Sequence, residues 1–271
     1  QVRADILVAL AAHQREAPDE PVGFAALRRR VGHDDPGNFN YHLSQLRGNL
    51  VENTEEGYRL STVGQHYVAL LVSGRFDPDE KREFPEVETA CPVCRVEASI
   101  EYEDGLLRTT CREGHESRLT VGPELLDEWS VEQTLSIALR RNLFEAKSVL
   151  EGVCPYCEGA TDGRFEQTDS EGLSVRYEGG CKRCGMTLQN TAGGCVLFYP
   201  AVVSFCYRRG IDVYQRAWEV MTTHIETVSV ESEDPLRVAV ELVVDGDSLV
   251  VTLDRSAAVT GVTEVPAANR Q

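Results

Sequence analysis

The sequence predicts an α+β, multidomain protein, and three observations lead to this prediction. Residues 1–76 combine stretches of helical periodicity with one short pair of strands. Closely spaced cysteines and one histidine follow in two sets, within residues 91–115 and 154–184. Later, residues 225–253 alternate between apolar and polar side chains, as strands do. Together these features predict an N-terminal winged helix-turn-helix, two zinc-ribbon modules linked by a helix, and C-terminal helices plus an antiparallel sheet.

The N-terminal segment has the element order helix, helix-turn-helix, hairpin, helix. The predicted elements are helices at 2–16 and 24–31, a third helix that begins at Pro36, strands at 50–54 and 57–61, and a helix at 62–72. Gly32 ends the second helix, and Asp34 or Asp35 caps the third. The apolar side of the third helix consists of Phe39, Leu43, Leu46 and Leu50. A small helical core domain with a stray hairpin is the alternative to a winged helix-turn-helix.

Linkers and cysteines divide the chain into modules. The expected divisions are 1–76 for the winged helix-turn-helix, 77–122 for a charged linker with the first ribbon, 123–150 for a connecting helix, 151–198 for the second ribbon, 199–265 for an α/β region and 266–271 for a tail. Each ribbon needs a hairpin, which we place at 98–102 with 106–110 and at 163–167 with 173–177. The α/β region is predicted to hold helices near 200–209 and 213–222, then strands at 225–230, 236–244 and 249–253. Asp245-Gly246-Asp247 predicts the turn of the last hairpin.

Charge and composition restrict the class of protein. The chain of 271 residues carries a formal charge of −17, and only Lys81, Lys147 and Lys182 among its 27 basic residues are lysines. This combination is typical of proteins that function in molar salt, so we expect a halophilic archaeon as the source. The longest apolar runs, such as 196–203, are too short to cross a bilayer. We expect a soluble, cytoplasmic protein with no membrane partner, and, because residue 1 is Gln, further residues before it.

The acidic charge is unevenly distributed. Residues 1–75 contain 8 basic and 9 acidic residues and therefore carry −1, which leaves −16 for the other 196 residues. An acidic chain is a poor general ligand for nucleic acid, but this first module is close to neutral. DNA binding by residues 1–75 therefore remains compatible with the composition.

The two cysteine sets predict metal sites. The ligands are Cys91, Cys94, Cys111 and His115 in the first set and Cys154, Cys157, Cys181 and Cys184 in the second. Two sulfurs three positions apart in a tight turn occupy two corners of a tetrahedron, and a second turn brought in by a hairpin completes it. We therefore expect two Zn²⁺ ions per chain. Because each site supplies four protein ligands and leaves no position for water, both are predicted to be structural.

Alternatives remain for the cysteines. Paired but metal-free thiols are possible in either set, and iron on four cysteines is possible in the second. Cys195 and Cys206 lie outside both sets. We favour small buried side chains for these two, with a redox or metal-sensing thiol as the alternative, although no neighbour in sequence would activate a thiolate.

The third predicted helix carries a polar side opposite its apolar one. Its candidate DNA-binding residues are Gly37, Asn38, Asn40, Tyr41, Ser44, Gln45 and Arg47, and the hairpin adds Arg59. Asn and Gln side chains pair with adenine edges in the major groove, and glycines allow close approach to the duplex. Between Gly37 and Gly48 no residue is acidic. A solvated polar face is the alternative, and the acidic hairpin tip at Glu55 and Glu56 argues against deep insertion of the wing.

Three stretches carry a resemblance to a known family. F-A-A-L-R-R-R-V-G, D-P-G-N-F-N-Y-H-L-S-Q-L and E-E-G-Y-R-L-S-T-V-G resemble the winged helix-turn-helix of ArsR-like transcriptional regulators of the halobacterial (haloarchaeal) type, over about residues 2–74. The two ribbons and the segment P-A-V-V-S-F…G-I-D-V are also similar to those regulators. The resemblance implies a homodimer that binds operator DNA through the helix carrying 39–46, with contacts from Asn38, Asn40, Tyr41 and Gln45. Metal-sensing members carry a cysteine in the preceding helix, whereas 24–32 has none.

The sequence therefore predicts a sequence-specific DNA-binding transcriptional regulator with double-stranded DNA as its partner and no enzymatic activity. The alternative is a zinc-ribbon adaptor that binds proteins of the transcription machinery without operator specificity of its own. In the regulator, the C-terminal α/β region would serve dimerisation, response to a small effector or contact with a partner protein. Its aromatic residues either line a ligand pocket or, as we favour, form a core between helix and sheet; they are Tyr199, Phe205, Tyr207, Tyr214 and Trp218.

Overall fold

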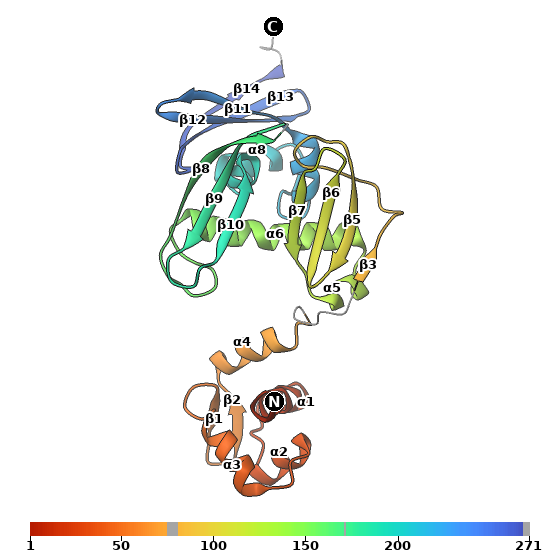
Figure 1. Cartoon of the computed structure of the whole chain (residues 1–271), viewed down its shortest axis with the longest axis vertical. Coiled ribbons are helices and arrows are strands. Elements are labelled where there is room, and N and C mark those ends of the chain that lie inside the picture. The colour runs from red at the N-terminus through yellow and green to blue at the C-terminus, as the bar shows by residue number, and fades with distance from the viewer. Residues whose placement is uncertain (75–80, 171, 268–271) are drawn as a thin grey trace. The chain divides into compact units, whose positions relative to one another are not determined.

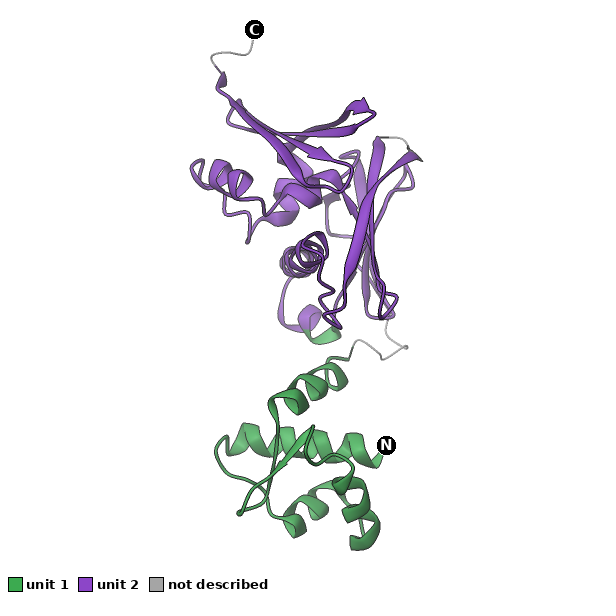
Figure 2. Cartoon of the chain, turned by 90° about the vertical axis from the view of Figure 1, so that its left-hand side faces the viewer, with its two compact units in different colours: residues 1–78, 122–124 green, residues 79–121, 125–271 purple. Residues whose placement is uncertain are grey.

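A computed structural model describes residues 1–74, 81–170 and 172–267 of the chain. These residues belong to two compact units (Figure 2). The first comprises Gln1–Pro78 and Gly122–Glu124, and the second comprises Asp79–Val121 and Leu125–Gln271. Parts of the predicted linker (77–80) and tail (268–271) lie outside the described residues. The second unit contains both cysteine sets, the connecting helix and the C-terminal region, so these modules share one compact unit.

The first unit follows the predicted element order (Figure 1). Its elements are α1 (Val2–Glu16), α2 (Phe24–Val31), α3 (Pro36–Ser44), β1 (Val51–Asn53), β2 (Tyr58–Leu60) and α4 (Thr62–Leu71). Gly32 ends α2 with a left-handed φ of 71°, and Asp35, not Asp34, caps α3. A single core of apolar side chains from all four helices and both strands holds the unit together. Its fully buried members include Ile6, Leu10, Leu27, Phe39 and Leu43.

The third helix is shorter than its apolar pattern predicts. It ends at Ser44, and a turn follows in which Gly48 adopts a φ of 86° and donates its N–H to the carbonyl of Val51 at 3.0 Å. Leu46 is nevertheless buried, because the turn folds back onto the core that the helix already covers. Leu46 is therefore buried as predicted, although the helix that was predicted to carry it has already ended.

The second unit contains two antiparallel sheets that both contact one long helix (Figure 1). The first sheet is built from β3 (Lys81–Glu83), β4 (Thr89–Ala90), β5 (Glu97–Glu103), β6 (Leu106–Cys111) and β7 (Glu116–Thr120), in the order β3-β5-β6-β7 with β4 also beside β5. The second is built from β8 (Thr161–Ser170), β9 (Leu173–Cys181) and β10 (Thr187–Thr191), in the order β10-β9-β8. The predicted linker is thus partly a strand, since β3 pairs with β5.

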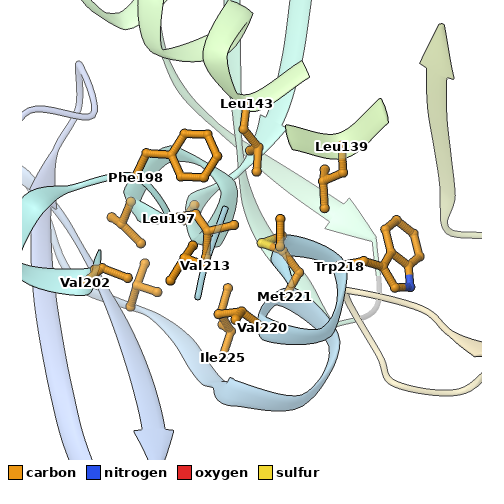
Figure 3. Close-up of a cluster of buried hydrophobic side chains, with 14 of the residues drawn as sticks. Leu139, Leu143, Leu197, Phe198, Val202, Val213, Trp218, Val220, Met221 and Ile225 are labelled. Atoms are coloured by element: carbon orange, nitrogen blue, oxygen red, sulfur yellow. The ribbon is translucent and has the colours of Figure 1, made fainter. Parts of the chain in front are cut away.

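The connecting segment, which we expected to be one long or broken helix, is broken into α5 (Pro123–Glu128) and α6 (Val131–Leu150). The break is explained by Ser130, whose side chain accepts from the N–H of Gln133 while Gln133 accepts from the N–H of Ser130. One side of α6 is buried against both sheets and against the C-terminal helices. Figure 3 shows Leu139 and Leu143 of α6 meeting Phe198, Met221 and Trp218 in this core.

The C-terminal region contains short helices and a four-stranded antiparallel sheet. Its elements are α7 (Ala192–Val196), α8 (Pro200–Tyr207), α9 (Ala217–Glu219), the π-helical turn Val220–His224, and strands β11 (Ile225–Glu233), β12 (Leu236–Val244), β13 (Asp247–Asp254) and β14 (Val259–Val265) in sequential order. The predicted helix at 213–222 was wrong in extent, and α7 and β14 were not predicted. Of the five aromatic residues expected in a core, Phe205 and Trp218 are buried, but Tyr207 is 75% exposed. Within the described ranges, no helix combines the length and apolar character needed to span a bilayer.

Arg209 ties the end of α8 to this sheet. Its guanidinium donates to the carboxylates of Asp247 at 2.6 Å and Glu264 at 3.0 Å and lies 3.8 Å from the centre of the Phe205 ring. Arg209→Met should lower the free energy of unfolding by about 1–2 kcal/mol, because it leaves the partly buried Asp247 and the more exposed Glu264 without this largely buried cation. Urea denaturation measures the change. The matched Arg208→Met removes a more exposed ion pair with Glu264 and should cost less than about 0.5 kcal/mol; equal losses would contradict this account.

Two candidate metal centres and a polar helix face

The first cysteine set lies where turns join the strands of the first sheet. Cys91 and Cys94 occupy the turn between β4 and β5, which closes when the N–H of Cys91 bonds to Val96 at 2.8 Å and the N–H of Arg95 bonds to Cys91 at 2.9 Å. Arg95 takes a positive φ of 60° to complete this turn. Cys111 ends β6, and His115 follows in the turn before β7.

The second set repeats this plan in the second sheet. Cys154 accepts from the N–H of Glu158 at 3.0 Å and donates its own N–H to Gly159 at 2.9 Å, so the turn holds Cys157 beside it. Cys181 ends β9 and donates its N–H to the carbonyl of Met186 at 2.8 Å across the turn that carries Cys184. The structure thus brings together all eight predicted ligands, four in each set.

The distances within each set suit a tetrahedral ion. All ligand atoms of a set lie within 4.8 Å of one another. The separation is 3.7 Å between the sulfurs of Cys154 and Cys184, 3.5 Å between those of Cys157 and Cys181, and 3.6 Å between Cys111 Sγ and His115 Nδ1. Four sulfurs at about 2.3 Å from a central ion would be about 3.8 Å apart. Each set therefore has the donors and the spacing to hold one metal ion.

Backbone donors prepare some of these thiols for metal binding. Although burial opposes it, N–H groups of His115 and Glu113 lower the pKa of Cys111 to about 7. N–H groups of Cys184 and Arg183 lower the pKa of Cys181 to about 6. In contrast, burial raises the pKa of Cys91 to about 11. Each set thus contains one thiol that ionises readily, and the first set also contains one, Cys91, that needs a bound cation to do so.

A turn of the second sheet lies against the first cysteine set. Gly172, at the start of β9, takes a φ of 75°, and a Cβ at this position would lie 3.9 Å from His115 and 4.0 Å from Cys94. No motif in the sequence indicates this contact, since 57 residues separate Gly172 from His115. Only the arrangement of both sheets on α6 creates it.

The predicted DNA-binding residues of α3 lie on an exposed side of the helix. Asn38, Asn40 and Tyr41 are exposed, whereas Phe39 and Leu43 on the opposite side are fully buried. The carboxylate of Asp35 accepts from the N–H groups of Gly37 at 2.7 Å and Asn38 at 3.1 Å. Both bonds lower the pKa of Asp35, and the bond from Asn38 has the larger effect. The N-terminal end of α3 is thus fixed by its own cap.

The remaining predicted contacts depart from a simple helix face. Gln45 and Arg47 are exposed but follow the end of α3, and Ser44 is half-buried with its hydroxyl donating to the carbonyl of Tyr41 at 2.7 Å. Arg59 on β2 forms an ion pair with Glu52 on β1 at 2.7 Å. Binding of a phosphate by Arg59 would therefore have to compete with this carboxylate.

The two cysteines outside the sets belong to the core of the second unit. Cys206 is fully buried, which confirms the prediction of a small buried side chain, and burial raises its pKa to about 11. Cys195 packs against the same core, and burial raises its pKa well above the ordinary value. Both thiols therefore stay protonated near neutral pH and are poor nucleophiles.

Comparison with known proteins gives two matches. A family model described as "Domain of unknown function (DUF7351)" matches residues 88–259, and one described as "Domain of unknown function (DUF7347)" matches residues 1–71. The boundary between these matches falls near the boundary between the two compact units. No curated protein matches the chain, and neither does any solved structure.

Proposed function

This chain belongs to the DUF7351 family, and we propose from its own residues that it is a sequence-specific DNA-binding transcriptional regulator. In this proposal the first unit acts as a winged helix-turn-helix and α3 enters the major groove. The second unit is held in shape by two structural Zn²⁺ ions. The order α1-α2-α3-β1-β2-α4 around one core supports this assignment for the first unit.

The observation that carries the proposal is the exposed side of α3. Asn38, Asn40 and Tyr41 are exposed there, Gln45 is exposed directly after the helix, and no acidic residue lies between Gly37 and Gly48. In a chain with a net charge of −17, such a neutral segment is the surface least repelled by phosphate. In molar salt, counterion release contributes little, so contacts to base edges would supply most of the affinity.

Zinc is the ion that best fits the two metal centres. Three thiolates with one imidazole, and four thiolates, are donor sets of structural zinc sites, and both have four ligands at tetrahedral spacing. Iron would require four cysteines and could fit only the second set. The zinc ions would fix the turns that hold the sheets on α6, because a ribbon of this size has too small a core of its own.

The resemblance to ArsR-like regulators adds a homodimer to the proposal. Two copies would place two α3 helices on successive half-sites of an operator. Cytoplasmic DNA in a salt-rich cell is the corresponding partner. Because α2 has no cysteine, metal sensing at that helix is not part of the proposal.

Titration against DNA tests the proposal directly. The zinc-loaded chain, in high potassium chloride, should bind DNA from upstream of its own gene more tightly than a scrambled duplex. Asn40→Ala and Gln45→Ala should each weaken that binding by about 1–3 kcal/mol, because each removes a bidentate contact to a base. The matched control is Gln65→Ala on α4, also exposed, which should bind as the wild type does.

Equal affinity for the upstream and the scrambled duplex, with no loss of affinity in Asn40→Ala or Gln45→Ala, would reject the regulator and favour the adaptor. In that case the first unit would be a docking module for proteins of the transcription machinery.

A further inference from the structure

Two of the three described sheets of the second unit each leave one edge strand beside the same groove. Among the described strands, β7 ends the sheet of β3–β7, β10 ends the sheet of β8–β10, and α6 contacts both of these sheets (Figure 1). Every residue of β7 and of β10 lines a groove of about 620 Å³ between these edges. The two strands run in opposite directions. β7 begins beside the first cysteine set, and β10 begins beside the second. The β8–β9 turn at Gly172, at the other end of the second sheet, lies against the first set, so β10 runs towards the first set while β7 runs away from it.

The backbone of β7 presents alternate residues to this groove. In an antiparallel pair, the N–H and C=O of one residue point to the partner strand and those of the next point away. The carbonyl of His115 accepts from Cys111 at the end of β6, and the N–H of Val121 donates to Gly105 just before β6, which assigns 117 and 119 to that side as well. The backbone groups of Glu116 and Arg118 therefore point outward. Thr120 agrees with this assignment, because its carbonyl accepts a hydrogen bond from Arg141 of α6.

The same reasoning applies to β10. The carbonyl of Met186 accepts from Cys181 on β9, so the backbone groups of 188 and 190 also point to β9. Those of Thr187, Gln189 and Thr191 point away from β9. The groove is thus bordered on both sides by peptide groups in strand conformation that face away from their own sheets.

The floor of the groove suits side chains of a strand. We call the apolar residues of its lining the floor; they are Leu139, Val149, Met186, Leu188, Trp218 and Met221. The charged side chains that line the groove balance, since Glu116 and Glu145 are matched by Arg118 and Arg176. A strand between β7 and β10 would direct alternate side chains to this floor and the others to solvent. The groove therefore selects an extended chain of alternating apolar and polar residues without a high net charge.

We propose that this groove binds an extended segment of a partner protein as an additional strand between β7 and β10. Main-chain hydrogen bonds to both edges would supply affinity, and the apolar floor would select side chains. The bound segment would join the two sheets into one. This activity is independent of the proposed DNA binding, because every residue involved belongs to the second unit.

Selection from a phage-displayed library of random heptapeptides on the immobilised, zinc-loaded full-length chain tests the proposal. Enriched peptides should alternate apolar and polar residues, and N-methylation at alternate positions should abolish their binding. Arg118→Pro and Gln189→Pro should each weaken binding at least tenfold, because each removes one N–H that faces the groove and keeps the bonds to β6 or β9. Arg118→Ala and Gln189→Ala lose the same side chains but keep the N–H, so they measure the side-chain contribution and should each weaken binding less than the corresponding proline variant does.

Hydrogen exchange of the wild type supplies a readout that does not depend on folding of a variant. The amides of Glu116, Arg118 and Gln189 should exchange more slowly when an enriched peptide is bound, and those of Ser117 and Leu188 should not change. The proposal is overturned if no peptide is enriched, if these amides are not protected, or if the N-methylated peptides bind equally well. The last result would indicate a ligand pocket that recognises side chains alone.

Discussion

Cys154→Ser should reduce the zinc content from two ions per chain to one and unfold the second unit. Cys154 is fully buried, and its sulfur lies 3.7 Å from that of Cys184. A serine hydroxyl does not replace a thiolate as a zinc ligand. Structural zinc contributes roughly 10 kcal/mol or more of binding free energy, which is comparable to the whole stability of a typical domain. Elemental analysis and thermal unfolding followed by circular dichroism measure both effects.

Unfolding should not stop at the second ribbon. Phe165, Val175 and Tyr177 of that sheet belong to the same core as α6 and the C-terminal sheet, so loss of the ribbon exposes a face of each. Cys195→Ser is the control, because Cys195 lies outside both sets, and this variant should keep both ions. If Cys154→Ser retains two zinc ions and its thermal transition, the metal centre is not structural.

Gly64→Ala should destabilise the first unit by about 3 kcal/mol or more. A Cβ at this position would lie 2.0 Å from the carbonyl oxygen of Leu50, and because that oxygen is backbone, no rotamer change relieves the clash. Helix propensity alone predicts the opposite, a gain of about 1 kcal/mol from replacing Gly in a helix. The steric term is larger, so α4 must move away from the core that Val68 helps to fill.

Hydrogen exchange resolved along the chain measures this effect in one unit at a time. Amides of α1 should lose protection in Gly64→Ala, whereas the zinc content should stay unchanged, because both metal centres lie in the other unit. Gly23→Ala provides the matched control. Gly23 has an ordinary φ of −67°, and no atom lies within 4 Å of a Cβ at that position, so protection of α1 should be retained. Equal protection in both variants would show that α4 tolerates the displacement.

Local chemistry made parts of the fold predictable from sequence. Caps and turns depend on a few adjacent residues, which is why the end of α2 at Gly32, the start of α3 at Pro36 and the turn at Asp245-Gly246 agree with the structure. Cysteine spacing predicted both clusters for the same reason. The DNA contacts remain predictions, because an exposed polar side chain has the same appearance in a sequence whether it binds a base or water.

Features that depend on distant residues were not predictable. The edge strands β7 and β10 are short and mostly polar, so they lack the apolar alternation that marks a strand, and their position follows from pairing with β6 and β9. The end of α3 was missed because Leu46 and Leu50 continue the helical spacing while the backbone turns at Gly48. The groove depends on two sheets that share α6, and no single segment encodes it.

The contact of Gly172 with the first metal centre has a practical consequence for labelling and for comparison of related chains. Hairpin tips are usually the safest places for an inserted tag or a dye, and they are where related proteins differ most in length. At this tip an added side chain would begin in van der Waals contact with His115 and Cys94, the ligands of an ion that belongs to the other sheet. A dye or tag attached at residue 172 would therefore contact the first metal centre. The exposed hairpin tip at Glu55 and Glu56, remote from both metal centres in sequence, is the better site for one.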